Sequence, residues 1–253
     1  MKYKSLIVEN IKATINSYIF KYLLITSLII NIVYTLNILF NNLSFNYLES
    51  LYYISTNAFY ILFFLALILI NTINTLHIFN KNTFYIIRFH SKKEYYNSLI
   101  KNVFLVNSIF YFINMILLIT MCNLIFGSTF VITNWQQYNV INIVYIIFHF
   151  VKCLIIIEII TTLFPIIYKA YGRIGMIVYL LFIGIPLLLS SYKVEIINDI
   201  WKMSLFPVNY LSGGNYSSFS LELFSTFIYI IILLIFYCIS FEIIKRKVKG
   251  VIE

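Results

Sequence analysis

Charged side chains are scarce in this sequence. Only 18 Lys and Arg and 9 Asp and Glu occur among 253 residues, so charged residues make up 11% of the chain, against about 25% in an average soluble domain. Hydrophobic residues reach 62%, and the mean hydropathy is +0.93. A soluble fold cannot cover so much apolar surface with so few charges, which excludes a cytosolic enzyme, a disordered chain and a nucleic-acid-binding domain. The composition predicts an all-α, polytopic membrane protein.

Motifs for catalysis and for nucleotide or metal binding are also lacking. The 7 glycines do not form a GxxxxGK[ST] phosphate-binding loop, and neither HExxH nor GxSxG occurs. Cys122, Cys153 and Cys238 lie far apart in apolar runs without a CxxC spacing, and the 3 histidines are scattered. We therefore expect no enzyme activity, no cofactor and no metal. Any ATP that the protein uses must be bound by another chain.

Long hydrophobic runs dominate what is present. A bilayer core takes about 20 residues of helix, and six runs qualify, which predicts a single transmembrane domain over residues 1–253. The expected spans are residues 20–40, 52–73, 103–126, 140–164, 174–189 and 223–241.

The basic residues predict how these spans are oriented. Most of the 18 lie before the first span, between the second and third, between the fourth and fifth, and after the sixth. Because basic residues flank spans on the cytoplasmic side, we expect both termini in the cytoplasm. A composition rich in Ile, Asn, Tyr, Phe and Lys resembles the codon bias of an AT-rich bacterial genome. It indicates a bacterial cytoplasmic membrane, and it leaves the many asparagines without a functional interpretation.

Two further segments are predicted to lie at the membrane surfaces. Residues 3–20 place Ile7, Ile11 and Ile15 at helical spacing, which predicts an amphipathic elbow helix on the inner leaflet. Residues 191–222 combine an apolar helical stripe with a Phe-Pro break and a Gly-Gly turn, which favours a broken, re-entrant external segment. An ordinary external loop is the alternative. The residues singled out in this segment are Trp201, Pro207 and Tyr210.

The cytoplasmic segment 83–96 carries the most information. Thr83 can cap a short aromatic helix, and Ser91 with Glu94 forms a Ser-x-x-Glu capping box at the start of the next helix. An ordered, basic and aromatic helix facing the cytoplasm suits docking into the groove of a partner protein. The alternative is a lipid-facing amphipathic segment with its arginine at headgroup level. The candidate coupling residues are Phe84, Tyr85, Arg88, Lys92 and Glu94.

The fourth span contains His149, Lys152 and Glu158. Ionisable side chains inside a membrane are costly and should face protein or water. Lys152 and Glu158 are six residues apart, which is about 9 Å along a helix and about 120° around it. They cannot pair on one helix face, so each needs a partner on another span, on another protomer or in water. A buried cluster between spans, a substrate pathway and a proton relay with His149 all stay open as interpretations.

These features together resemble a permease of the second family of ABC exporters. The resemblance rests on Arg88, on the stretch 91–95 followed by Lys101, and on the Pro207 segment 206–211, which resembles a re-entrant segment before the last span. The family implies a dimer of permeases, either a homodimer or a heterodimer, with two separate ATP-binding-cassette ATPase subunits. Small, aromatic-rich permeases of Gram-positive bacteria in this family resemble exporters of peptides, such as phenol-soluble modulins, and lantibiotic-immunity permeases.

The sequence therefore predicts the membrane subunit of an ATP-driven exporter whose substrate is an amphipathic or hydrophobic peptide. Aromatic residues make up 19% of the chain. Tyrosines on span faces would offer such a peptide an apolar surface with a polar tip. Two alternatives stay open: a secondary transporter that couples to protons through Lys152, Glu158 and His149, and a membrane scaffold without transport activity.

Overall fold

The computed structural model describes residues 2–41, 47–81, 92–127, 134–135, 140–191 and 219–249. This part of the chain is almost wholly helical, as the sequence predicts. Its helices are α1 (Lys2–Asn16), α2 (Tyr18–Phe40), α3 (Tyr47–Thr56), α4 (Ala58–Lys81), α6 (Lys92–Phe126), α7 (Asn142–Ser191) and α10 (Phe219–Lys249). A short antiparallel ladder joins β1 (Asn134–Trp135) to β2 (Val140–Ile141) just before α7.

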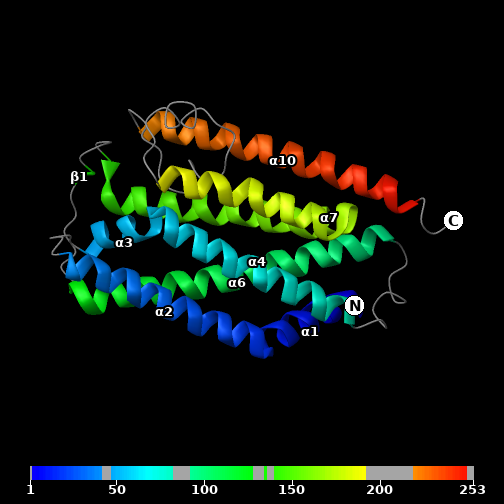
Figure 1. Ribbon diagram of the computed structural model, residues 1–253, viewed down its shortest axis with the longest axis horizontal. Coiled ribbons are helices and arrows are strands. Elements are labelled where there is room, and N and C mark those ends of the chain that lie inside the picture. The colour runs from blue at the N-terminus through cyan, green and yellow to red at the C-terminus, as the bar shows by residue number, and fades with distance from the viewer. Residues whose placement is uncertain are drawn as a thin grey trace.

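The long helices lie side by side along the longest axis of the molecule, and both chain ends lie at the same end of this bundle (Figure 1). Within the described residues, five helices are long and apolar enough to cross a membrane. They are Tyr18–Phe40, Phe59–Phe79, Asn97–Phe126, Ile143–Tyr168 and Phe219–Ile239. A polytopic helical membrane protein is thus confirmed. The expected span 174–189 is not among the five, and the orientation in the membrane stays a prediction.

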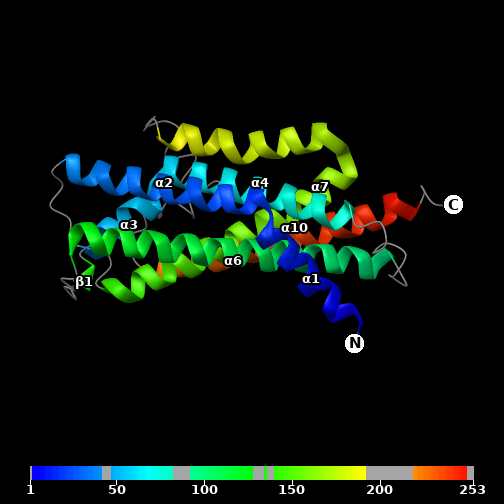
Figure 2. The same cartoon turned by 90° about the horizontal axis from the view of Figure 1, so that it is seen from below.

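A break at Ser17 separates α1 from α2. Ser17 is extended (φ −65°, ψ 146°), and its hydroxyl accepts a hydrogen bond from the Phe20 amide at 3.2 Å, which caps α2. The same oxygen accepts from Asn74 Nδ2 of α4 at 2.9 Å. The helix expected over residues 3–20 therefore ends at Asn16, and α1 leaves the bundle at an angle (Figure 2). Its position on the inner leaflet stays a prediction.

The expected second span, residues 52–73, does not form one helix. Asn57 lies between α3 and α4 and caps α4, because its Oδ1 accepts from the amides of Phe59 and Tyr60 at 3.0 and 3.2 Å. Ser55, Thr56 and Asn57 interrupt the apolar run at this cap, which is the sequence signal for the break. The membrane-crossing stretch is shifted to Phe59–Phe79.

The helix α6 is a single rod of 35 residues. At about 1.5 Å per residue it is about 52 Å long, well beyond a hydrocarbon core of about 30 Å. It contains the whole expected third span, 103–126, and reaches back to Lys92. Gly127 ends it with φ +76°, and the Gly127 amide donates to the carbonyl of Asn123.

The helix α7 runs from Asn142 to Ser191 but folds back on itself at Gly172 (φ 63°, ψ −149°), a backbone conformation that glycine adopts without strain. Its second arm, which contains the expected fifth span, returns along the bundle (Figures 1 and 2). Near the fold the arms touch, because the Tyr179 hydroxyl donates to the Ile160 carbonyl at 2.7 Å. Residues 165–173, between the expected fourth and fifth spans, are therefore helical apart from the turn at Gly172.

The main core lies where α2, α4, α6 and the first arm of α7 meet. It includes Phe64 and Ile68 of α4, Phe110 of α6 and Ile156 of α7, each less than 5% exposed. The helix α10 packs mainly on α7. Its face turned away from the bundle keeps large apolar side chains exposed, as expected for a surface in contact with lipid.

Uncharged polar side chains connect three of these helices inside the core. Asn114 Oδ1 of α6 accepts from the Ser27 hydroxyl and from Asn31 Nδ2 of α2, the latter at 3.1 Å. Asn114 Nδ2 donates to the Tyr60 hydroxyl of α4 at 3.0 Å, and that hydroxyl donates to Asn31 Oδ1 at 2.9 Å. We call these four residues the amide cluster. It gives the asparagines a structural role that the composition did not reveal.

Candidate functional site

A buried ion pair connects α7 to α10. Lys152 Nζ lies 2.7 Å from Glu222 Oε1, and the two side chains are 1% and 0% exposed. Glu222 is in the first turn of α10, where the positive end of the helix dipole stabilises a carboxylate. The sequence predicts that Lys152 needs a partner on another span, on another protomer or in water, and the structure identifies that partner as Glu222 of α10.

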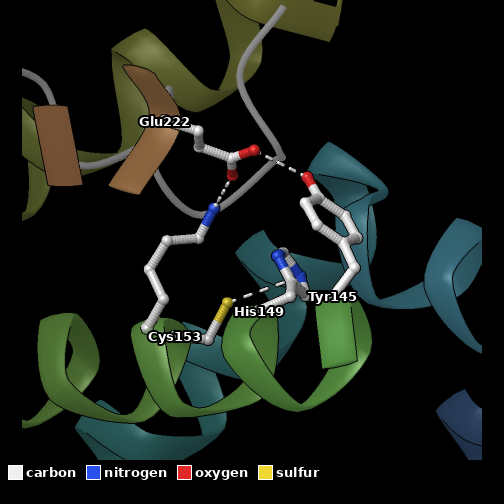
Figure 3. A network of polar contacts seen from close by, with 5 residues as sticks. Tyr145, His149, Cys153 and Glu222 are labelled. Carbon is white, nitrogen blue, oxygen red and sulfur yellow. Dashed lines mark hydrogen bonds and ion pairs between the residues drawn. The ribbon is translucent and has the colours of Figure 1, made fainter. Parts of the chain in front are cut away.

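The second carboxylate oxygen of Glu222 is also occupied. The Tyr145 hydroxyl donates to Glu222 Oε2 at 2.8 Å, as Figure 3 shows. Tyr145 and Lys152 are seven residues apart on α7, about two turns, so both reach the carboxylate from one helix face. Each oxygen of Glu222 thus has a donor from α7, and we call Tyr145, Lys152 and Glu222 the ion-pair site.

Aromatic rings surround the ion-pair site. Lys152 Nζ lies 5.5 Å from the centroid of the Phe148 ring, within the range of a cation–π contact. The Phe219 ring of α10 packs against Tyr145 and Phe148 with centroids 6.0 and 5.2 Å away, and Tyr52 of α3 packs on the other side of Tyr145 at 5.5 Å. This apolar cover strengthens the attraction between the charges, and it increases the cost of losing either partner.

His149 lies next to this site without joining the ion pair. It is fully buried, its ring packs against Tyr52 at 5.6 Å, and its Nε2 lies 3.5 Å from Cys153 Sγ one turn further along α7 (Figure 3). Among the described residues, no group of three or more His, Cys, Asp or Glu side chains is placed to hold a metal ion. Within the same described residues, no ion pair joins His149 to Glu158.

Glu158 has different surroundings from Lys152. Its Oε1 accepts from the Ser108 hydroxyl of α6 at 2.7 Å. Its Oε2 has no hydrogen-bond partner among the described residues. The side chain is only 3% exposed, yet it lines a groove between α6, α7 and α10. The structure therefore places the two charges of the fourth span in two separate environments.

Sequence reasoning missed Glu222. The sixth span was expected to begin at Leu223, which left Glu222 as the last residue of the external segment. The helix α10 begins earlier, at Phe219, so Glu222 lies within its first turn. An acidic residue just before an apolar run is the usual sign of a helix start, and this signal could have moved the boundary.

Most of the other predicted site residues lie outside the described part of the chain. Phe84, Tyr85 and Arg88 of the expected coupling segment lie outside the described residues, as do Trp201, Pro207 and Tyr210 of the expected re-entrant segment. Lys92 is the first residue of α6, and Glu94 is exposed in its first turn.

Comparison with known proteins gives no family assignment. No family model, no curated protein and no solved structure matches this chain.

Proposed function

We propose that this chain is the membrane subunit of an ATP-driven exporter of amphipathic or hydrophobic peptides. The observation that carries the proposal is the ion-pair site. Charged residues inside a membrane bundle are rare and mark functional positions. A single ion pair that connects α10 to α7 is a contact that two arrangements of the helices can make or break. Alternating access requires such a two-state element.

The helix α6 supports a mechanism in which force is transmitted along the bundle. It is continuous from Lys92 to Phe126, so it joins the expected cytoplasmic coupling segment 83–96 directly to the opposite end of the bundle. Closure of an ATPase against that segment would move α6 as one rigid body. Glu158, which accepts a hydrogen bond from Ser108 of α6, would be moved with that helix.

Two kinds of partner follow from the proposal. The sequence has no phosphate-binding loop, so a separate ATP-binding-cassette ATPase must supply ATP hydrolysis. A second permease copy, identical or different, completes the pathway. We also propose the bacterial cytoplasmic membrane with both termini in the cytoplasm, which the charge distribution supports.

The decisive first observation is whether the neighbouring gene encodes a stand-alone ATPase with a phosphate-binding loop. The chain and that ATPase should then be reconstituted in vesicles and tested for ATP-dependent movement of an amphipathic peptide. The isolated chain should hydrolyse no ATP. Arg88→Glu should uncouple hydrolysis from transport or dissociate the complex, whereas Arg88→Lys should retain most coupling. Robust hydrolysis by the pure chain, or unimpaired transport by Arg88→Glu, contradicts the proposal.

A second candidate function is secondary transport coupled to protons. The observation that favours it is Glu158 Oε2, a buried carboxyl oxygen without a hydrogen-bond partner among the described residues. The same vesicles separate the two candidates. Peptide uptake driven by an imposed proton gradient in the absence of ATP supports the second function and removes the first.

A further inference from the structure

The groove beside Glu158 has the size of a ligand site. It lies between α6, the first arm of α7 and α10, and its volume is about 630 Å³, within the usual range of about 300–1,000 Å³ for binding pockets. Its walls are almost entirely apolar. Phe104, Ile155 and Leu234 line it and are 45%, 37% and 46% exposed, so a ligand that entered would cover them.

Glu158 adds to this apolar groove one carboxyl group that still lacks, within the described part of the chain, a hydrogen-bond donor for one of its oxygens. The carboxyl group is 3% exposed, and Ser108 satisfies only Oε1. Oε2 has no hydrogen-bond partner among the described residues. Lys152 is not available as a donor, because its ammonium group is paired with Glu222. A buried carboxyl oxygen that lacks a donor is costly, so the group that best completes this site is a cation or another strong donor carried by the ligand.

The length of the groove corresponds to two turns of a helix. Its α7 wall runs from Leu154 to Thr162 and its α10 wall from Ile230 to Tyr237, which are about 12 and 10.5 Å at helical rise. A peptide helix docked in a groove uses side chains at positions i, i+3, i+4 and i+7, which also span about 10.5 Å. One face of a helix therefore fits this groove in length.

A second charged residue, Lys101 of α6, also lines the groove. Its side chain is exposed. Lys101 precedes Ser108 by seven residues on α6, so the two share a helix face about 10.5 Å apart along the axis. The groove thus presents a carboxyl group at one level and an ammonium group about two turns away.

We infer that this groove docks one face of an amphipathic peptide helix, with a lysine ammonium of the peptide on Glu158 and an acidic group of the peptide towards Lys101. The inference rests on the proposed function and names the site where the substrate first binds. Charge complementarity selects this occupant over a lipid chain, because a hydrocarbon tail offers Glu158 Oε2 no donor.

The test uses the full-length chain in phosphatidylcholine nanodiscs without any ATPase. The probe is a synthetic 18-residue amphipathic helix with one lysine on its apolar face and a photoreactive leucine analogue one turn away. A second probe has norleucine in place of that lysine. We expect the lysine peptide to bind and to label the groove wall near Phe104 and Leu234. Glu158→Gln should weaken its binding about tenfold or more, because a charge-assisted contact becomes a neutral one.

Three controls make the result specific. The norleucine peptide should bind the original chain and Glu158→Gln equally. Glu94→Gln, which removes an exposed carboxylate outside the groove, should change neither affinity. Leu234→Trp, which fills the groove without altering Glu158, should weaken the binding of both peptides.

Several outcomes would overturn the inference. These are equal binding of the lysine peptide to the original chain and Glu158→Gln, labelling outside the groove, or, in a chain that carries the photoreactive leucine analogue at position 234, chain-to-chain crosslinks that show a second copy in place of the peptide. If ATP-driven export proceeds while the groove variants leave binding unchanged, this inference fails and the proposed function stands. If the peptide binds as expected but no ATPase couples to the chain, the proposed function fails and the site stands.

Discussion

Two buried carboxylates at α7, Glu222 and Glu158, differ in how many of their oxygens accept a hydrogen bond from the described residues. Glu222 reaches α7 from α10 and has a donor on each oxygen, Lys152 Nζ on one and the Tyr145 hydroxyl on the other. Glu158 belongs to α7 itself and has one donor among the described residues, from Ser108, while its other oxygen is buried without a hydrogen-bond partner among them. A carboxylate whose two oxygens both accept from protein donors connects helices. A carboxylate with one oxygen that lacks a donor can still accept a hydrogen bond from a ligand. Glu222 therefore connects α10 to α7, whereas the unpaired oxygen of Glu158 is the part of this region that we propose binds a ligand.

The largest effect is expected from opening the ion-pair site. Lys152→Met leaves the Glu222 carboxylate buried, with the Tyr145 hydroxyl as its one remaining side-chain donor among the described residues. Breaking a buried ion pair by removal of one partner costs about 3–5 kcal/mol, so the free energy of unfolding should fall by about that amount. Thermal unfolding of the purified chain, followed by circular dichroism in one detergent, measures it.

The double variant Lys152→Met/Glu222→Gln is the matched control. Because it leaves no uncompensated charge, it should recover a large part of the stability that Lys152→Met loses. If instead the losses in the free energy of unfolding of the two single variants simply add, the two charges do not act as a pair. Glu222 would then not differ from Glu158 in the way proposed.

A smaller effect is expected at the second oxygen of Glu222. Tyr145→Phe removes the hydrogen bond to the buried Glu222 carboxylate together with the hydroxyl's contact to Tyr52, and it keeps the aromatic ring that packs against Tyr52 and Phe219. Hydrogen bonds to charged groups contribute about 1.5–3 kcal/mol, and the free energy of unfolding should fall within that range. A Tyr145→Phe variant as stable as the original chain would mean that Lys152 alone holds Glu222.

The sequence predicts the helical membrane fold because apolar runs and sparse charge leave few other structures. It also predicts that Lys152 and Glu158 cannot pair with each other, since helix geometry places residues six apart on different faces. Both predictions use local rules. The cost of a charge in lipid then requires that both side chains face the protein, and each is at most 3% exposed.

The partners of these charges could not be predicted in the same way. Glu222 is 70 residues from Lys152 along the chain, and only the packing of α10 on α7 brings the two together. The helix break at Asn57 was missed although the sequence carries a signal for it, because Ser55, Thr56 and Asn57 interrupt the apolar run and an Asn before an apolar stretch is a typical helix start. The asparagines of the amide cluster were interpreted as codon bias, since composition cannot show which of them face one another.

The amide cluster gives the next comparison, between charged and uncharged connections of helices. Asn114→Ala removes the group that contacts Ser27, Asn31 and Tyr60 at once. Polar contacts between membrane helices contribute about 1–2 kcal/mol in peptides, so the loss of stability should be near that value and below the loss for Lys152→Met. Asn123→Ala, at an exposed position of the same helix, is the control and should have little effect. A loss as large as that for Lys152→Met would show that charge is not what makes the ion-pair site costly to break.

The smallest effect on stability is expected at Glu158. Its size distinguishes a carboxylate that connects helices from one that binds a ligand. In Glu158→Gln the side-chain carbonyl can still accept from Ser108, so the one hydrogen bond of this group is kept. The exchange of a charged for a neutral acceptor weakens that bond by about 1 kcal/mol, but it also removes the cost of burying a charge whose second oxygen has no donor. These effects oppose each other, so the free energy of unfolding should change by less than about 1 kcal/mol. The same carboxylate-to-amide change at Glu222 should be several times more costly, because there it strands the Lys152 ammonium. If Glu158→Gln destabilises the chain as much as Glu222→Gln, Glu158 is a second helix connection and the groove has no carboxylate to offer a ligand. If Glu158→Gln leaves the free energy of unfolding unchanged and weakens binding of the lysine peptide only, Glu158 acts in ligand binding and not in helix packing.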